Sequence, residues 1–129
     1  MLTPTDFVQE WLKAISSNDA GTIVSLYKED AVLLGTLDSK VRKGTKSIRE
    51  YFDHFVTLRP QGKITQIICD EISGGAAITA NGLYDLELCE DDKTTKVKAR
   101  FTFVLEKGAT NWIILSHHSS KIPGKQDII

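Results

Sequence analysis

The residues with the richest chemistry in this sequence stand together near its end, in the stretch WIILSHHSSKIP at positions 112–123. Two histidines, His117 and His118, and two serines, Ser119 and Ser120, follow a run of apolar residues. Imidazole binds metal ions and transfers protons near neutral pH, and a serine hydroxyl becomes a nucleophile beside a base. The stretch is therefore compatible with a metal site, a nucleophile and base pair, a ligand pocket or a solvated strand end.

Spacing weakens two of these hypotheses. Neighbouring strand residues such as His117 and His118 point to opposite faces, so one metal ion does not readily take both. The third histidine, His54, falls near the polar side of an expected helix. No G-x-S-x-G turn is present, and no aspartate is placed by sequence to orient a histidine beside a serine. The sequence predicts no metal site and no cofactor, and it leaves proton transfer by His117 as the remaining catalytic hypothesis.

The elements that must position these residues begin with helices. Thr3 can cap a helix that has Pro4 at its first position, and Phe7, Trp11 and Ile15 then share one apolar face. A third helix buries Ile48, Tyr51, Phe52 and Phe55 in the same way. The expected segments are a helix over 3–17, a shorter helix over 19–31, two extended pieces within 31–44 and a helix over 45–58.

The second half of the chain is typical of an antiparallel sheet. Four runs that end in short polar turns are expected to form strands at 63–72, 76–89, 95–106 and 111–120. Helices followed by a strand meander predict an α+β fold, with three N-terminal helices packed on a strongly curved antiparallel sheet. The last two strands carry large apolar groups on both faces. One face goes under the helices, and a second copy of the protein is the simplest cover for the other.

Composition limits the function further. The chain of 129 residues has a net charge of -1 and no basic block, which gives no reason to expect binding to nucleic acid or to a membrane surface. Cys69 and Cys89 have no metal spacing and are expected to be reduced thiols of a cytoplasmic protein. No signal peptide and no apolar stretch of ~20 residues are expected. The sequence predicts one domain over 1–123 and a loosely held tail over 124–129.

The order of four motifs resembles a known family. These motifs are SLYKEDAVLL, KGTKSIREYF, KARFTFV and WIILSHHSSKIP. The pattern is similar to the nuclear transport factor 2-like cone in its SnoaL-like branch, and within it to the association domain of calcium/calmodulin-dependent protein kinase II and its stand-alone bacterial relatives. The resemblance covers residues 3 to 123. It implies a cone with a pocket at its wide end and oligomers that form through the sheet, a homodimer or a higher ring.

The resemblance also implies a candidate site. In the kinase domain the pocket is lined by arginines, of which one maps onto Arg100, one onto Ser119 and one near Gly82, so a single pocket arginine remains in this sequence. If Arg100 points inward, Thr102 does too, and the mapping of Ser119 brings His117, Leu115 and Ile113 inward. A bulge would instead bring His118 inward. The expected ligand-binding residues are Arg100, Tyr84, Thr102, His117, Ser119, Trp11 and Tyr51.

Three functional hypotheses follow, of which the third is a pure assembly module with a filled pocket. The first is a non-catalytic, homo-oligomerising protein whose pocket binds a small polar or carboxylate-bearing ligand, with Asp30, Glu50 or that ligand as the partner of Arg100. The second is a cofactor-independent lyase, isomerase or cyclase that uses His117 as acid or base. Kinase activity is not expected, because the chain has no Gly-rich loop, HRD-type loop or DFG motif.

Overall fold

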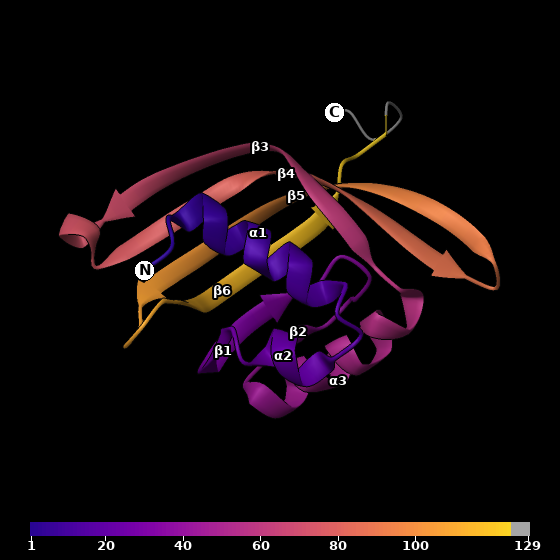
Figure 1. The fold of residues 1–129 in the computed structure, drawn as a ribbon, viewed down its shortest axis with the longest axis horizontal. Coiled ribbons are helices and arrows are strands. Elements are labelled where there is room, and N and C mark those ends of the chain that lie inside the picture. Colours follow the sequence, from indigo (N-terminus) through magenta and orange to yellow (C-terminus); the bar gives the residue numbers. More distant parts are fainter. Residues whose placement is uncertain (125–129) are drawn as a thin grey trace.

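The computed structural model describes residues 1–124, in which helices precede a meander of long strands (Figure 1). The elements are α1 (Pro4–Ile15), α2 (Ala20–Val24), β1 (Tyr27–Leu34), β2 (Val41–Lys43), α3 (Thr45–Phe55), the 3-10 turn η1 (Val56–Leu58), β3 (Gln61–Ile72), the 3-10 turn η2 (Ser73–Gly75), β4 (Ala77–Glu90), β5 (Lys93–Lys107) and β6 (Trp112–Lys121). The predicted α+β class, with three helices on a curved sheet, is confirmed. Except for Gly124, the predicted tail over 124–129 lies outside the described residues.

The strands form one open sheet of six, in the order β2-β1-β6-β5-β4-β3. Consecutive long strands pair antiparallel, but β1 runs parallel to β6, with Leu33 opposite His117 and Leu34 opposite His118. The expectation of a wholly antiparallel sheet is therefore wrong at this pair. A parallel pair needs a long crossover, and the intervening α3 and β3–β5 meander supply it. The short hairpin of β2 extends the sheet beyond β1.

Helix α1 lies across the concave side of the sheet (Figure 1). Thr3 caps it as expected, since its hydroxyl accepts the backbone N–H of Asp6 at 3.1 Å. The approach of α1 to β3 is close enough to require glycine at position 62, because a Cβ there would lie 2.8 Å from a methyl carbon of Leu12. Helix α3 buries the predicted residues Ile48, Tyr51, Phe52 and Phe55.

The second helix is shorter than the sequence predicts. It ends at Val24, and Tyr27 begins strand β1 in the place where the helix was expected to continue to residue 31. The alternation of buried Tyr27, Ala31 and Leu33 follows a strand period of two. Pairing with β6 therefore overrides the local helical pattern of this segment.

Strand β6 contains a bulge that changes which residues face the core. The pairing with β5 shifts between Val104, which is opposite Ser116, and Leu105, which is opposite Ile114, so that Leu115 is the extra residue. Ile114 and His117 consequently both point inward, and Ile113 and Leu115 point outward. The register inferred from the sequence placed Ile113 and Leu115 inward, and this is wrong because both precede the shift at the bulge. The same register placed His117 and Ser119 inward, and both do point inward.

Candidate functional site

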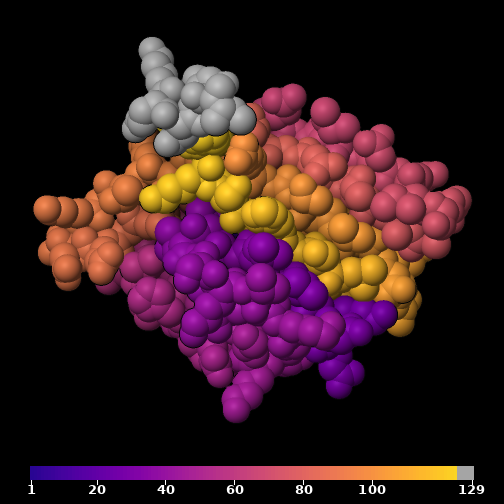
Figure 2. Space-filling view, turned by 180° about the vertical axis from the view of Figure 1, so that it is seen from behind, coloured from indigo at the N-terminus to yellow at the C-terminus, as the bar shows by residue number. Residues whose placement is uncertain are grey.

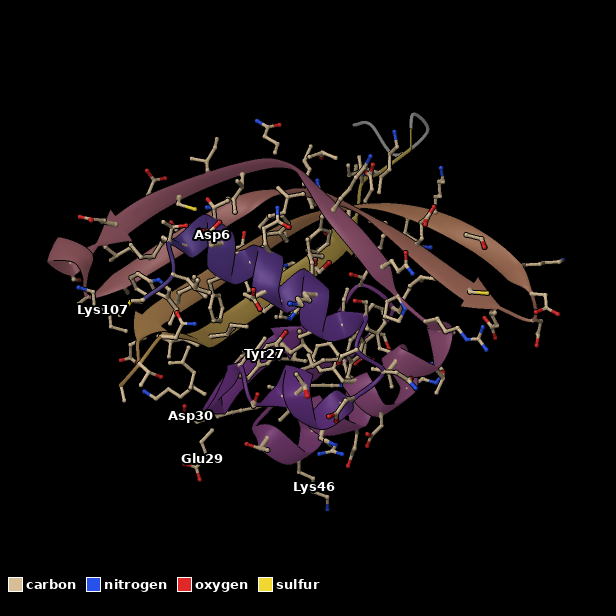
Figure 3. All side chains as sticks on the ribbon, viewed as in Figure 1. Asp6, Tyr27, Glu29, Asp30, Lys46 and Lys107 are labelled. Atoms are coloured by element: carbon tan, nitrogen blue, oxygen red, sulfur yellow. The ribbon has the colours of Figure 1, made fainter. Side chains whose placement is uncertain are left out.

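The concave side of the sheet holds a group of polar side chains joined by hydrogen bonds, which we call the inner cluster. Its members come from five parts of the chain and are Trp11 on α1, Tyr27 on β1, Thr36 in the loop after β1, Tyr84 on β4, and His117 and Ser119 on β6. Tyr27 lies between the helices and the sheet (Figure 3). Of the six residues, only Thr36 is less than fully buried.

His117 stands at the centre of the inner cluster. Its Nδ1 lies 2.8 Å from the hydroxyl of Tyr27, and its Nε2 lies 3.3 Å from the hydroxyl of Tyr84. The ring stacks on Phe103 with centroids 3.9 Å apart and meets Trp11 edge-on at 4.9 Å. Both ring nitrogens thus have partners inside an aromatic cage.

The hydrogen bonds of the inner cluster run in one direction. The indole N–H of Trp11 can only donate, and it donates to Tyr27 at 3.0 Å, so Tyr27 gives its own proton to Nδ1 of His117. Tyr84 donates to Ser119 at 2.6 Å, which leaves its oxygen to accept the Nε2 proton of His117. His117 is therefore a neutral imidazole protonated on Nε2.

The chain of hydrogen bonds ends at Thr36. Either hydroxyl can donate in the contact between Ser119 and Thr36, and we assign the Ser119 proton to Thr36 because this leaves no buried donor of the inner cluster unused. Every donor from Trp11 to Ser119 points toward the loop that follows β1. Bonds aligned in this way polarise one another, so the hydroxyl of Ser119 is a strengthened donor.

Burial sets the protonation of the inner cluster. Burial, the larger cause, and the electrostatic effect of neighbouring His118 together lower the pKa of His117 to about 3. Burial also raises the pKa of the Tyr27 and Tyr84 hydroxyls well above the ordinary range for tyrosine, so both phenols stay protonated. The inner cluster is uncharged at neutral pH.

Side chains fill the interior of the cone. Next to the inner cluster only about 10 Å³ of free space remains, between residues of α1, β1, α3, β4, β6 and the loop after β1. The ring of Tyr51 lies against Gly35, where a Cβ would be 2.4 Å from the ring, and the Tyr51 hydroxyl accepts the backbone N–H of Leu37 at 3.4 Å. An open pocket was expected here, and the structure shows a closed one.

Two predicted site residues do not reach the inner cluster. Arg100 and Thr102 lie on the convex side of the sheet. Phe101 and Phe103 are buried on the concave side, and alternate residues of a strand face opposite sides. The expectation that both point into the cone is wrong. Arg100 is exposed and donates through Nε to Ser120 at 3.2 Å; neither Asp30 nor Glu50 is its partner. Tyr84, His117, Ser119, Trp11 and Tyr51 do come together as predicted.

The convex side of the sheet, which we call the outer face, offers a second region. Seen from behind, the side chains of β4, β5 and β6 form a surface that the described helices leave uncovered (Figure 2). Its half-buried apolar members are Val32, Leu34, Leu83, Val104, Ile113 and Leu115. A shallow depression of about 310 Å³ lies beside them, lined by Arg100, Phe101, Thr102, His118 and Ser120.

Two members of the inner cluster were not among the predicted site residues. Tyr27 stood inside a segment predicted to be helical, and Thr36 stood in a turn without periodicity.

Within residues 1–124, no three His, Cys, Asp or Glu side chains are grouped so that they could hold a metal ion. No helix in that part of the chain is long and apolar enough to cross a membrane.

Comparison with known proteins identifies the family. The model of the calcium/calmodulin dependent protein kinase II association domain matches residues 5–123. The chain belongs to this family. A crystal structure from Xanthomonas campestris described as such an association domain is 32% identical, with 92% of this chain and 85% of that chain covered and a TM-score of 0.88.

More distant structures share the fold of this association domain. The hub homology domain of the kinase from Chlamydomonas reinhardtii is 16% identical, with 89% of this chain and 92% of that chain covered and a TM-score of 0.70. A protein from Novosphingobium aromaticivorans described as a scytalone dehydratase is 8% identical, with 97% of this chain and 85% of that chain covered and a TM-score of 0.81. No curated protein matched the sequence.

Proposed function

We propose that this association domain is a non-catalytic protein that assembles with copies of itself through the outer face of its sheet and holds a small polar ligand at the inner cluster. The observation that carries the proposal is the set of half-buried apolar side chains that β1, β4, β5 and β6 present on the side away from the helices. Apolar side chains at the surface that are surrounded by polar groups are typical of contact with another protein. The association domains of the family supply the precedent for a second copy as the partner.

Charge at the edge of the outer face favours the same partner. Lys63, Asp85 and Lys98 stand opposite one another on β3, β4 and β5, and the next row holds Glu87 and Lys96. Positive and negative groups therefore lie close together on one surface. In a two-fold interface each patch meets its own copy, and a patch that carries both signs can pair with itself.

The state of His117 supports a non-catalytic protein. A general base works best with a pKa near the operating pH, whereas the pKa of His117 is about 3. Its one lone pair already accepts the proton of Tyr27, and its N–H is already given to Tyr84. The ring is therefore engaged as a structural link between two phenols.

A small lyase, isomerase or cyclase remains the second candidate function. The fold is shared by the protein described as a scytalone dehydratase and by the epoxide hydrolase/cyclase-like enzyme SalBIII, to which the chain is 22% identical with a TM-score of 0.67. The feature that favours it is the histidine held between two phenols in a dry cage. This candidate requires an opened site in which the pKa of His117 rises toward neutrality.

Sedimentation velocity tests the assembly. At protein concentrations of roughly 1 to 100 µM, the wild type is expected to sediment as a dimer or a larger species. Ile113→Lys places a charge in the apolar outer face and is expected to give monomers. Leu37→Lys is the matched control, because Leu37 is exposed in the loop after β1, and it should behave as wild type. A wild type that stays monomeric throughout would overturn the proposal.

A further inference from the structure

The last acceptor in the hydrogen-bond chain of the inner cluster comes from a loop, whereas the donors before it come from α1 and the sheet. In the assignment given above, Ser119 donates its proton to Thr36, which lies between β1 and β2 and is half-buried. Any other acceptor oxygen placed at the same point would receive the same hydrogen bond. Thr36 thus occupies the position that a ligand acceptor would take.

The loop and Tyr51 close the site together. Gly35 touches the Tyr51 ring, the N–H of Leu37 donates to the Tyr51 hydroxyl, and Asp38 contacts Arg42. Arg42 in turn donates to the carbonyl of Ser47 on α3 at 3.0 Å. A shift of the loop away from β6 would therefore remove Thr36 from Ser119 and free the Tyr51 ring in one movement.

The walls of the inner site carry no full positive charge among the described residues. Arg100 faces outward. His117 is the lining residue that could become positively charged by protonation, and it is neutral. A buried carboxylate without a cation is strongly unfavourable, whereas a neutral acceptor needs only the hydrogen bond. The lining therefore suits a carbonyl oxygen better than the carboxylate that the sequence suggested.

The rest of the lining indicates the body of the ligand. Aromatic rings of Trp11, Tyr51, Phe52, Phe55 and Tyr84 surround the space next to Ser119. Trp11 and Tyr84 are stacked with centroids 5.7 Å apart, and such flat apolar walls favour a planar, apolar molecule.

We propose that the inner cluster is a site for an uncharged aromatic carbonyl compound, whose oxygen replaces the Thr36 hydroxyl as acceptor of the Ser119 proton when the loop opens. This inference rests on the ligand part of the proposed function and adds the ligand class and the displaced group. It does not depend on self-association, because the outer face takes no part in it.

The experiment is an NMR titration of the full chain with three probes of similar size, namely acetophenone, ethylbenzene and benzoate. The indole N–H of Trp11 reports on the inner cluster, and the indole N–H of Trp112, which donates to the carbonyl of Leu2 at 2.8 Å, is the internal control. Acetophenone is expected to shift the Trp11 signal and to bind about tenfold more tightly than ethylbenzene, the effect of one good hydrogen bond. Benzoate should bind most weakly.

Variants of the last donor and acceptor sharpen the result. Thr36→Ala removes the competing acceptor and should strengthen acetophenone binding by about tenfold, while Thr36→Ser keeps it and should bind as wild type. Ser119→Ala should bind acetophenone and ethylbenzene equally. Three results would overturn the inference. They are equal affinity for acetophenone and ethylbenzene in both wild type and Thr36→Ala, a higher affinity for benzoate, and no shift of the Trp11 signal in either protein. Sedimentation of the same samples shows separately whether self-association holds.

Discussion

The two faces of the sheet are built from the same strands and differ in how their polar groups are satisfied. On the concave side, His117 and Ser119 are buried and every hydroxyl and ring nitrogen of the inner cluster has a partner. Among residues 1–124, no buried side-chain nitrogen or oxygen lacks one. On the convex side, His118 and Arg100 are exposed beside half-buried Leu115. The concave face is complete within one chain, whereas the outer face has apolar surface left for a partner.

This difference shows how neighbouring residues acquire opposite roles. His117 and His118 differ by one position, yet one is enclosed by aromatic rings and the other faces solvent. The pleat of β6 alone separates them. The next three predictions each compare a residue of the concave face with a residue of the outer face.

The largest effect is expected for the adjacent isoleucines on β6. Ile114→Ala removes a side chain with 0% exposure and should lower the free energy of unfolding by about 2–5 kcal/mol. Ile113→Ala, on the outer face, should lower it by less than about 1 kcal/mol in the monomer and weaken self-association instead. Urea unfolding at a concentration where the protein is monomeric, together with sedimentation, measures both. Equal losses of stability would remove the distinction between the faces.

A smaller loss is expected when one link of the inner cluster is deleted. Tyr84→Phe leaves the Nε2–H of His117 without a partner and removes one of the two hydrogen bonds of the Ser119 hydroxyl, and should lower the free energy of unfolding by about 1–3 kcal/mol. Thr102→Val on the outer face removes only an exposed contact with Asn81 and should change stability by less than about 0.5 kcal/mol. Thermal denaturation of both variants gives the comparison, and a Tyr84→Phe protein as stable as wild type would contradict the account.

The pH dependence of stability distinguishes the two histidines. The folded pKa of His117, about 3, lies below the unfolded value of about 6.5, so between these values the unfolded chain binds more protons. The stability contributed by neutral His117 is complete above pH 6.5 and is lost as the pH falls toward 3, by at most about 1.4 kcal/mol per pH unit.

Replacement of either histidine by glutamine provides the test of this pH dependence. His117→Gln should flatten the decline in the free energy of unfolding between pH 6.5 and 4, whereas His118→Gln should keep it. Urea unfolding across that range measures the slope, and a wild type with the slope of His117→Gln would show that the ring is not buried neutral.

Much of the fold was accessible from sequence because it depends on local patterns. The spacing of apolar residues predicted the buried face of α3, and the capping signal of Thr3 with Pro4 predicted α1. The parallel pairing of β1 with β6 joins segments about 85 residues apart, and no local pattern contains it. The short helix α2 was overextended for the same reason, since tertiary pairing decides that Tyr27 is in a strand.

The candidate site was predicted in part. His117, Ser119, Tyr84, Trp11 and Tyr51 share the concave side, as the family resemblance implied. The inward placement of Arg100 came from family resemblance, and the two phenylalanines that flank Thr102 decide otherwise. Thr36 could not be found, because a loop residue becomes part of a site only through the position of its strand.

The most direct test of the account is concentration-dependent hydroxyl-radical footprinting of leucine side chains. If the outer face is where copies meet, Leu83 and Leu115 should become protected as the protein concentration rises through the association range, while Leu37, which is 40% exposed in the loop after β1, should keep its reactivity. Unchanged reactivity of Leu83 and Leu115 in the assembled protein, or protection confined to Leu37, would contradict the assignment of the outer face as the surface of self-association.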